Sequence, residues 1–217
     1  MLSLMNQEAS IEEINTYTVG ERDTQLLLLR KQLFGSQLTG IASCPSCDEQ
    51  LEFRLDCNKV QSSQKESREG TSMMRLSGLD VEFKLPTVAD IATLDPQLSQ
   101  RDNTAILLKR CIVAVKEDGV DLSVDAVPEE VLDRVTRRMG EIEPEADMRL
   151  GLSCPRCTHS WLVSIDIVSF LWQEIHAWAS RILLEVHTIA AAYGWSESEI
   201  LAMTTRRRDV YLGMIQS

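Results

Sequence analysis

One short motif occurs twice in the chain, and it constrains the fold more than any other feature. Residues 43–56 and 153–166 align without a gap: each begins Ser-Cys-Pro-x-Cys, continues with apolar residues at alternate positions and ends in aspartate. Two thiolates on a tight turn can bind one metal ion from the same side, and two such turns supply the four sulfurs of a tetrahedral structural zinc site. Alternating apolar residues are typical of a half-buried strand. The repeat therefore predicts a zinc ribbon built from two knuckle-and-strand halves.

The predicted ligands of one structural Zn²⁺ per chain are Cys44, Cys47, Cys154 and Cys157. A single Cys-x-x-Cys pair can equally indicate thiol redox chemistry, but a second copy in the same register favours a shared metal. The two pairs stand 110 residues apart, whereas the common four-cysteine pattern separates its pairs by about 15–20 residues. The sequence therefore predicts a subdomain inserted between the two halves of the site. The isolated Cys57 and Cys111 are expected to be buried as small apolar side chains.

Composition and charge restrict the classes of function. The chain has 217 residues, of which 44% are hydrophobic and 25% charged, as in a folded soluble protein. A net charge of −11 disfavours a general nucleic-acid binder, because phosphate neutralisation requires a basic surface. No apolar run reaches the roughly 18 residues of a membrane span. Paired cysteines without a recognisable leader segment predict the reducing cytoplasm rather than a disulfide scaffold.

Helix and strand signals predict an α+β fold with a split zinc ribbon. The predicted parts are N-terminal helices in residues 1–40, ribbon halves in 41–57 and 148–166, an inserted α+β subdomain in 73–147 and a helical docking region in 167–217. Within the insert we expect a β-hairpin over residues 73–85, followed by helices. The polar stretch 61–72 is expected to be a loop.

The helical region begins with a long apolar pattern. Between Ile167 and Tyr193 apolar residues recur every three or four positions, which predicts one amphipathic helix about 39 Å long. Gly194 ends it, and two short helices are expected to follow.

The sequence contains no pattern that indicates catalysis. It lacks a glycine-rich phosphate loop, a nucleophile elbow and a His-Glu-x-x-His motif. His176 and His187 stand about 16 Å apart along the predicted helix, too far to share one metal. A four-sulfur zinc site also has no open position for water. We therefore predict a scaffold without catalytic residues or a small-molecule substrate.

The end of the chain is predicted to bind a partner. Gly194-Trp195 stands at a helix corner, where burial of a large aromatic by its own chain is difficult, and such aromatics are typical interface anchors. Three arginines in the first turn of the last helix oppose its macrodipole, which indicates an acidic partner within the chain or outside it, or else a solvated basic face. The predicted partner-binding residues are Trp195, Arg206, Arg207, Arg208 and Tyr211.

Two groups of motifs resemble a known family. Residues 170–176, 185–187, 192–203 and 206–212 resemble small baseplate proteins of contractile phage tails and of related extracellular contractile injection systems. Residues 78–86 and 107–112, with the second knuckle, are similar to the baseplate hub family of contractile-tailed bacteriophages. The resemblance spans about residues 73–217 and leaves the first knuckle and the N-terminal helices outside it.

The resemblance implies a structural baseplate component with no substrate, made in the cytoplasm and assembled into a phage-tail-like particle. Its partners would be other baseplate, hub or spike proteins. Two alternatives stay open at this point: a soluble hub assembly factor that is absent from the finished particle, and a zinc-ribbon regulator of transcription. The negative charge counts against the regulator, because it disfavours contact with phosphates.

Overall fold

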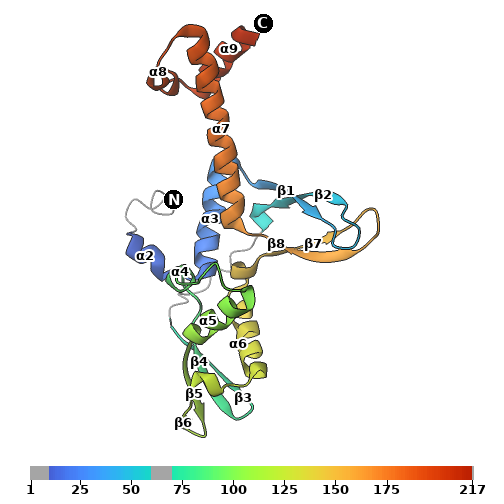
Figure 1. Cartoon of the computed structure of the whole chain (residues 1–217), viewed down its shortest axis with the longest axis vertical. Helices are drawn as coiled ribbons and strands as arrows, with labels where there is room; N and C mark the ends of the chain where they lie inside the picture. The colour runs from blue at the N-terminus through green and yellow to red at the C-terminus, as the bar shows by residue number, and fades with distance from the viewer. Residues whose placement is uncertain (1–9, 60–69, 217) are drawn as a thin grey trace. The chain divides into compact units, whose positions relative to one another are not determined.

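A computed structural model of the chain describes residues 10–59 and 70–216 and confirms the α+β fold with a long C-terminal helix (Figure 1). The chain divides into two compact units, Met1–Ile167 and Val168–Ser217. Among the described residues, none of the helices combines the length and the apolar character needed to span a membrane. Most of the predicted polar loop, residues 61–69, lies outside the described residues.

The first unit begins with two capped helices. In α2 (Ile11–Thr16) and α3 (Val19–Phe34), the caps are Ser10 and Thr18, each with a reciprocal glutamate in a capping box. The leucine block of α3 is largely buried, and the helix ends before Gly35, whose φ of 86° favours glycine. Both helices lie within residues 1–40, where the sequence predicts N-terminal helices.

The start of α3 packs closely on the short helix η3 (Pro144–Asp147) and its cap residue Glu143. The Glu143 side chain is almost fully buried, and the Thr18 hydroxyl donates a hydrogen bond to its carboxylate. A Cβ atom on Gly20 would lie 2.4 Å from the Glu143 Cγ. This contact therefore requires glycine at position 20.

An antiparallel sheet forms the inserted subdomain, with strand order β3 (Ser72–Leu76), β4 (Leu79–Phe83), β5 (Ile112–Glu117) and β6 (Val120–Asp121). The predicted hairpin over 73–85 exists, but it is shorter, because Leu76 pairs with Leu79 and the turn is Ser77-Gly78 alone. Both turn residues have positive φ, as a two-residue hairpin turn requires. β5 begins at Ile112, directly after α5, although the apolar residue Ile112 also fits the helical pattern of that helix.

Helices cover this sheet and complete its core. They are α4 (Val88–Ala92), α5 (Gln100–Cys111) and α6 (Glu129–Ile142), with a short η2 turn at Val124–Ala126. The core consists of sheet and α6 side chains that are at most 1% exposed: Val81, Phe83, Val115, Val131 and Val135. Cys111 is buried as predicted.

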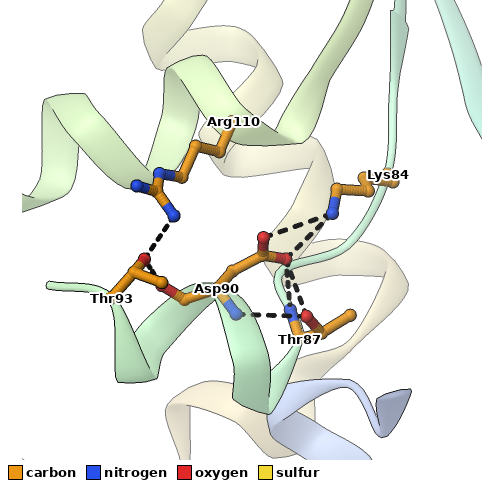
Figure 2. A network of polar contacts seen from close by, with 5 residues as sticks. All are labelled: Lys84, Thr87, Asp90, Thr93 and Arg110. Carbon is orange, nitrogen blue, oxygen red and sulfur yellow. Dashed lines mark hydrogen bonds and ion pairs between the residues drawn. The ribbon is translucent and has the colours of Figure 1, made fainter. Parts of the chain in front are cut away.

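A polar network fixes α4 between the end of β4 and α5 (Figure 2). The Asp90 carboxylate accepts hydrogen bonds from the Thr87 N–H at 3.0 Å and from the Thr87 hydroxyl at 2.8 Å, and the Lys84 Nζ lies 3.0 Å away. Burial raises the pKa of Asp90, but these hydrogen bonds and the Lys84 charge outweigh burial and lower it. Arg110 donates to the Thr93 hydroxyl and ties α5 to the end of α4.

Two further hairpins carry the cysteine pairs. β1 (Gln37–Ser43) pairs with β2 (Gln50–Asp56), which runs into a short η1 turn at Cys57–Lys59, and β7 (Arg149–Ser153) pairs with β8 (Ser160–Ser164). Figure 1 shows the two hairpins as neighbouring arms whose turns point the same way. β2, β7 and β8 match the predicted strands, whereas β1 was not predicted. Each knuckle is thus the turn of a complete hairpin.

In its described residues, 168–216, the second unit consists of three helices. α7 (Ile167–Tyr193) starts at the boundary between the units and matches the predicted long helix; α8 (Glu197–Leu201) and α9 (Thr205–Gln216) follow Gly194. Val186, Ile189 and Ile200 form a buried cluster that joins α7 to α8, and side chains of α9 pack against it. The C-terminal half of the α7 apolar stripe is therefore covered within this unit.

Candidate metal centre

The two cysteine turns have the same backbone geometry. In the first, the Asp48 N–H donates to the Cys44 carbonyl at 2.9 Å; in the second, the Thr158 N–H donates to the Cys154 carbonyl at 2.9 Å. The residue after each second cysteine has positive φ, 58° at Asp48 and 60° at Thr158. This conformation turns both thiols of a pair toward the same side, so each knuckle presents two sulfurs together.

The hairpins bring the four predicted ligands into one cluster. The Sγ atoms of Cys44, Cys47, Cys154 and Cys157 all lie within 4.8 Å of one another. The Cys44 and Cys157 sulfurs are 3.6 Å apart, as are those of Cys47 and Cys154. These distances are far longer than the roughly 2.05 Å of a disulfide. A tetrahedral ion with Zn–S bonds of about 2.3 Å requires sulfurs about 3.8 Å apart, so the donor set fits such an ion.

The thiols in the cluster do not ionise equally. A hydrogen bond from the His159 backbone N–H is the main cause that lowers the pKa of Cys157, to about 7. The Glu49 backbone N–H lowers the pKa of Cys47, but desolvation and the three neighbouring cysteines raise it by more, to about 12. Four thiolates this close repel one another, and a bound cation would offset the repulsion, since metal ligation requires deprotonated cysteine.

One contact outside the sulfurs links the two knuckles, and another anchors the base of the first hairpin. Arg156 of the second knuckle forms an ion pair with Glu49 of the first, at 3.3 Å. At the base of the first hairpin, the buried Arg30 donates to the carbonyls of Gly35 at 2.7 Å and Gln37 at 2.6 Å. Sequence reasoning did not single out Arg30, because an arginine within a helical pattern is usually solvent-exposed.

His159 beside the cluster and Cys57 at the base of the first hairpin have no ligand role in this geometry. His159 is exposed and stacks on Trp161, with ring centroids 6.1 Å apart. Cys57 is buried, as predicted for an isolated cysteine, and its sulfur lies 3.8 Å from the Arg30 Nη1. Among the described residues, the four knuckle cysteines form the one cluster of potential metal ligands.

A comparison with protein families identifies the chain. Residues 3–172 match the family described as T4 bacteriophage base plate protein. The chain belongs to this family. The match confirms the resemblance to baseplate proteins of contractile-tailed phages. A search of curated proteins found no match, and neither did a search of solved structures.

The extent of the family match differs from the extent of the predicted resemblance. The base plate family covers both cysteine hairpins, and it includes the N-terminal helices and the first knuckle, which the resemblance had left out. The match ends at Trp172, near the start of α7, so residues 173–217 lie beyond it. Family membership therefore describes the first unit, and the second unit has to be interpreted from its own structure.

The predicted partner-binding residues of this base plate protein occupy two environments. Trp195 packs against Tyr193 and Tyr211, with ring centroids 4.7 and 4.9 Å away, and Arg207 lies over the Tyr211 ring. Arg208 is buried, and its guanidinium donates to Glu185 at 3.0 Å and to the Met203 carbonyl at 2.8 Å. The acidic group that Arg208 meets therefore lies within the chain.

Arg206 and Arg207 remain exposed on α9. A docking role for this segment stays a prediction.

Proposed function

We propose that this protein is a structural component of the baseplate of a phage-tail-like contractile particle, in which one Zn²⁺ joins the two cysteine hairpins. Membership of the base plate family over residues 3–172 supports the baseplate role. The four sulfurs within 4.8 Å of one another carry the metal part of the proposal. The resulting protein is a scaffold that acts by holding its shape and contacting its neighbours.

Zinc is the metal that this donor set favours. Four thiolates in a tetrahedral arrangement select zinc or iron–sulfur chemistry over magnesium or calcium, which prefer oxygen ligands. The four sulfurs would fill every coordination position, which is typical of a structural zinc. Because zinc binding to such a site is coupled to folding, the ion would stabilise the arrangement of the hairpins.

Metal analysis of protein purified without chelator tests this assignment. We expect one zinc and no iron per chain, and loss of zinc in the Cys154→Ser variant. Cys111→Ala is the matched control: it removes a buried thiol at the end of α5, outside the cluster, and should keep one zinc. A wild-type protein that contains no zinc, or a Cys154→Ser variant that retains it, would refute the assignment.

The C-terminal segment is the part proposed to dock on neighbouring baseplate subunits. Arg206 and Arg207 are exposed, and Arg207 lies over the ring of the partly buried Tyr211, which packs against Trp195. Arg208 serves the fold instead, since it holds α9 against Glu185 of α7. Deleting residues 195–217 would uncover Val186 and Ile189, so substitutions at the surface test docking more cleanly than truncation.

Charge reversal of the two exposed arginines separates docking from folding. The double variant Arg206→Glu/Arg207→Glu should remain folded but enter particles less efficiently than the wild type. Arg181→Glu is the control, because Arg181 is an exposed arginine of α7 in the same unit. Equal incorporation of both variants, measured by mass spectrometry of purified particles, would contradict the docking role. Absence of the wild-type chain from finished particles would instead identify an assembly factor.

A further inference from the structure

The apolar residues of α7 follow a heptad repeat along the whole helix. Spacings of four and three alternate without interruption through Val168, Trp172, Ile175, Ala179, Ile182, Val186, Ile189 and Tyr193. A helix with a 3.5-residue apolar repeat presents a seam to another helix in a left-handed coiled coil. The repeat therefore predicts a helical neighbour along the full length of α7.

Within the second unit, only the C-terminal part of this seam is covered. Val186 and Ile189 are buried in the cluster with α8 and α9. Ile182 packs partly against this cluster, but the rest of the seam back to Trp172 and its flanks are open: Trp172 is 65% exposed, and the flanking Trp178 and Leu183 are 49% and 61% exposed. A hollow of about 440 Å³ lies beside the seam, lined by Trp172, Ile175, His176 and Ala179 among others. Large apolar side chains this exposed mark a contact surface.

The distribution of charge indicates what can approach this surface. Residues 168–217 contain four arginines and five carboxylates, a net charge of −1, which leaves −10 of the chain's −11 to residues 1–167. Between Val168 and Leu183 the charged residues are Glu174 and Arg181, and neither belongs to the heptad seam. Two copies of this acidic chain would therefore repel each other least if this nearly neutral face of one copy contacted the same face of the other.

The sizes of the seam residues favour an antiparallel pair of copies. In a parallel pair, Trp172 would face Trp172 and Ala179 would face Ala179, giving one overfilled layer and one underfilled layer. In an antiparallel pair related by a two-fold axis at the level of residue 177, Trp172 faces Ile182 and Ile175 faces Ala179. In this arrangement Glu174 and Arg181 lie outside the seam of both copies, so the pairing brings no like charges together.

We propose that the open part of the α7 seam binds the same part of a second copy of this chain as an antiparallel helix pair. This self-association does not depend on the proposed baseplate or zinc functions. The open stretch from Trp172 to Leu183 is about 18 Å long, so the pair would bury less than the roughly 800 Å² per partner of a standard interface. A dissociation constant on the order of 1–100 μM is therefore expected.

Sedimentation of the full metal-loaded chain over a concentration series tests the pair. We expect a monomer–dimer equilibrium for the wild type and a dissociation constant at least tenfold weaker for Trp172→Glu. Leu184→Glu is the matched control: Leu184 is an equally exposed leucine of α7, 65% accessible, on the opposite side of the helix. Circular dichroism of both variants checks that the helices persist. A wild type that stays monomeric to several hundred μM, or equal weakening by both variants, would overturn the proposal.

Disulfide trapping tests the orientation of the pair. A mixture of the Ile175→Cys and Ala179→Cys chains should form the mixed disulfide faster than either chain alone forms its own, because the two positions face each other in the antiparallel arrangement. A parallel pair would instead trap each variant with itself, and that result would refute the antiparallel assignment.

Discussion

The two cysteine hairpins share a turn but differ in what supports their strands. In β1 and β2, Leu38, Ala42 and Phe53 are buried, and Arg30 holds the base of the hairpin. In β7 and β8, side chains alternate between exposed and half-buried, and none is buried. The nearest buried residues in the chain are Cys154, in the turn of this hairpin, and Ile165, just after β8.

The difference shows that one sequence motif can depend on two sources of stability. The first hairpin has buried apolar side chains that do not depend on the sulfurs, so we expect its packing to persist without a metal. The second has little apolar burial of its own, and isolated two-stranded hairpins are marginally stable in water. We therefore expect the metal to act mainly on the second hairpin, by fixing its turn to a knuckle that is already anchored.

Metal removal should separate the two hairpins most clearly. In a chelator, amide hydrogens of β7 and β8 should exchange at least tenfold faster, while those of β1 and β2 change little, because only the second hairpin depends on the sulfurs. Hydrogen exchange measured by mass spectrometry on peptides from both hairpins checks this expectation. Helices α8 and α9 serve as an internal control, since their core contains no cysteine. Equal loss of protection in both hairpins would show that the metal supports them alike.

Replacing one leucine of each hairpin by alanine should have the opposite pattern: it should lower the free energy of unfolding more in the first hairpin than in the second. Leu38 is fully buried, so Leu38→Ala should lower the free energy of unfolding by about 2–5 kcal/mol. Leu150 is half-buried in β7, and Leu150→Ala should cost about 1 kcal/mol. Urea denaturation of the metal-loaded variants measures both values. Similar costs at the two positions would contradict the difference in support.

The sequence was sufficient to predict the repeated turn and the strands after it. The Cys-Pro-x-Cys copies lie in register, and alternation is a local signal. It also predicted the long helix α7, because that pattern extends over many turns. These features depend on residues close together in the chain.

The missed features depend on contacts between distant parts of the chain. β1 contains Gly40, which weakens a strand signal, and it is fixed by pairing with β2. Ile112 continues the helical pattern of α5 but pairs with Phe83 across the sheet, so tertiary pairing overrides local propensity. The sequence alone predicts that Arg30 is a solvent-exposed helix residue. Its hydrogen bonds to the carbonyls of Gly35 and Gln37 become evident only in the fold.

The next test compares Arg30 with Arg149, the arginine at the base of the second hairpin, whose ion pair is exposed. Arg30→Lys should lower stability by about 1.5–3 kcal/mol, since lysine cannot donate in the same fork geometry to the carbonyls of Gly35 and Gln37. At the base of the second hairpin, Arg149 forms an exposed pair with Asp147, and Arg149→Lys should leave the urea midpoint unchanged. An Arg30→Lys midpoint equal to that of the wild type would show that these hydrogen bonds do not anchor the first hairpin.

The smallest expected effect concerns the residues that follow the two knuckles. Asp48 and Thr158 have nearly the same positive φ, 58° and 60°, but this backbone region suits them differently. Aspartate is enriched there, whereas a β-branched threonine is a genuine outlier. Such strain costs of order 1–3 kcal/mol, and a new glycine costs about 0.5–1 kcal/mol through the freedom of the unfolded chain.

Thr158→Gly should therefore stabilise the second hairpin by about 1 kcal/mol, whereas Asp48→Gly should be neutral or slightly destabilising. The threonine hydroxyl also donates to the Cys157 carbonyl at 2.7 Å, and losing this bond reduces the gain, so the balance is narrow. The hydrogen bond is exposed, which makes relief of strain the larger of the two effects. The urea midpoints of the two metal-loaded glycine variants, compared with that of the wild type, measure the difference. A Thr158→Gly midpoint at or below that of Asp48→Gly would show that the second knuckle bears no more strain than the first.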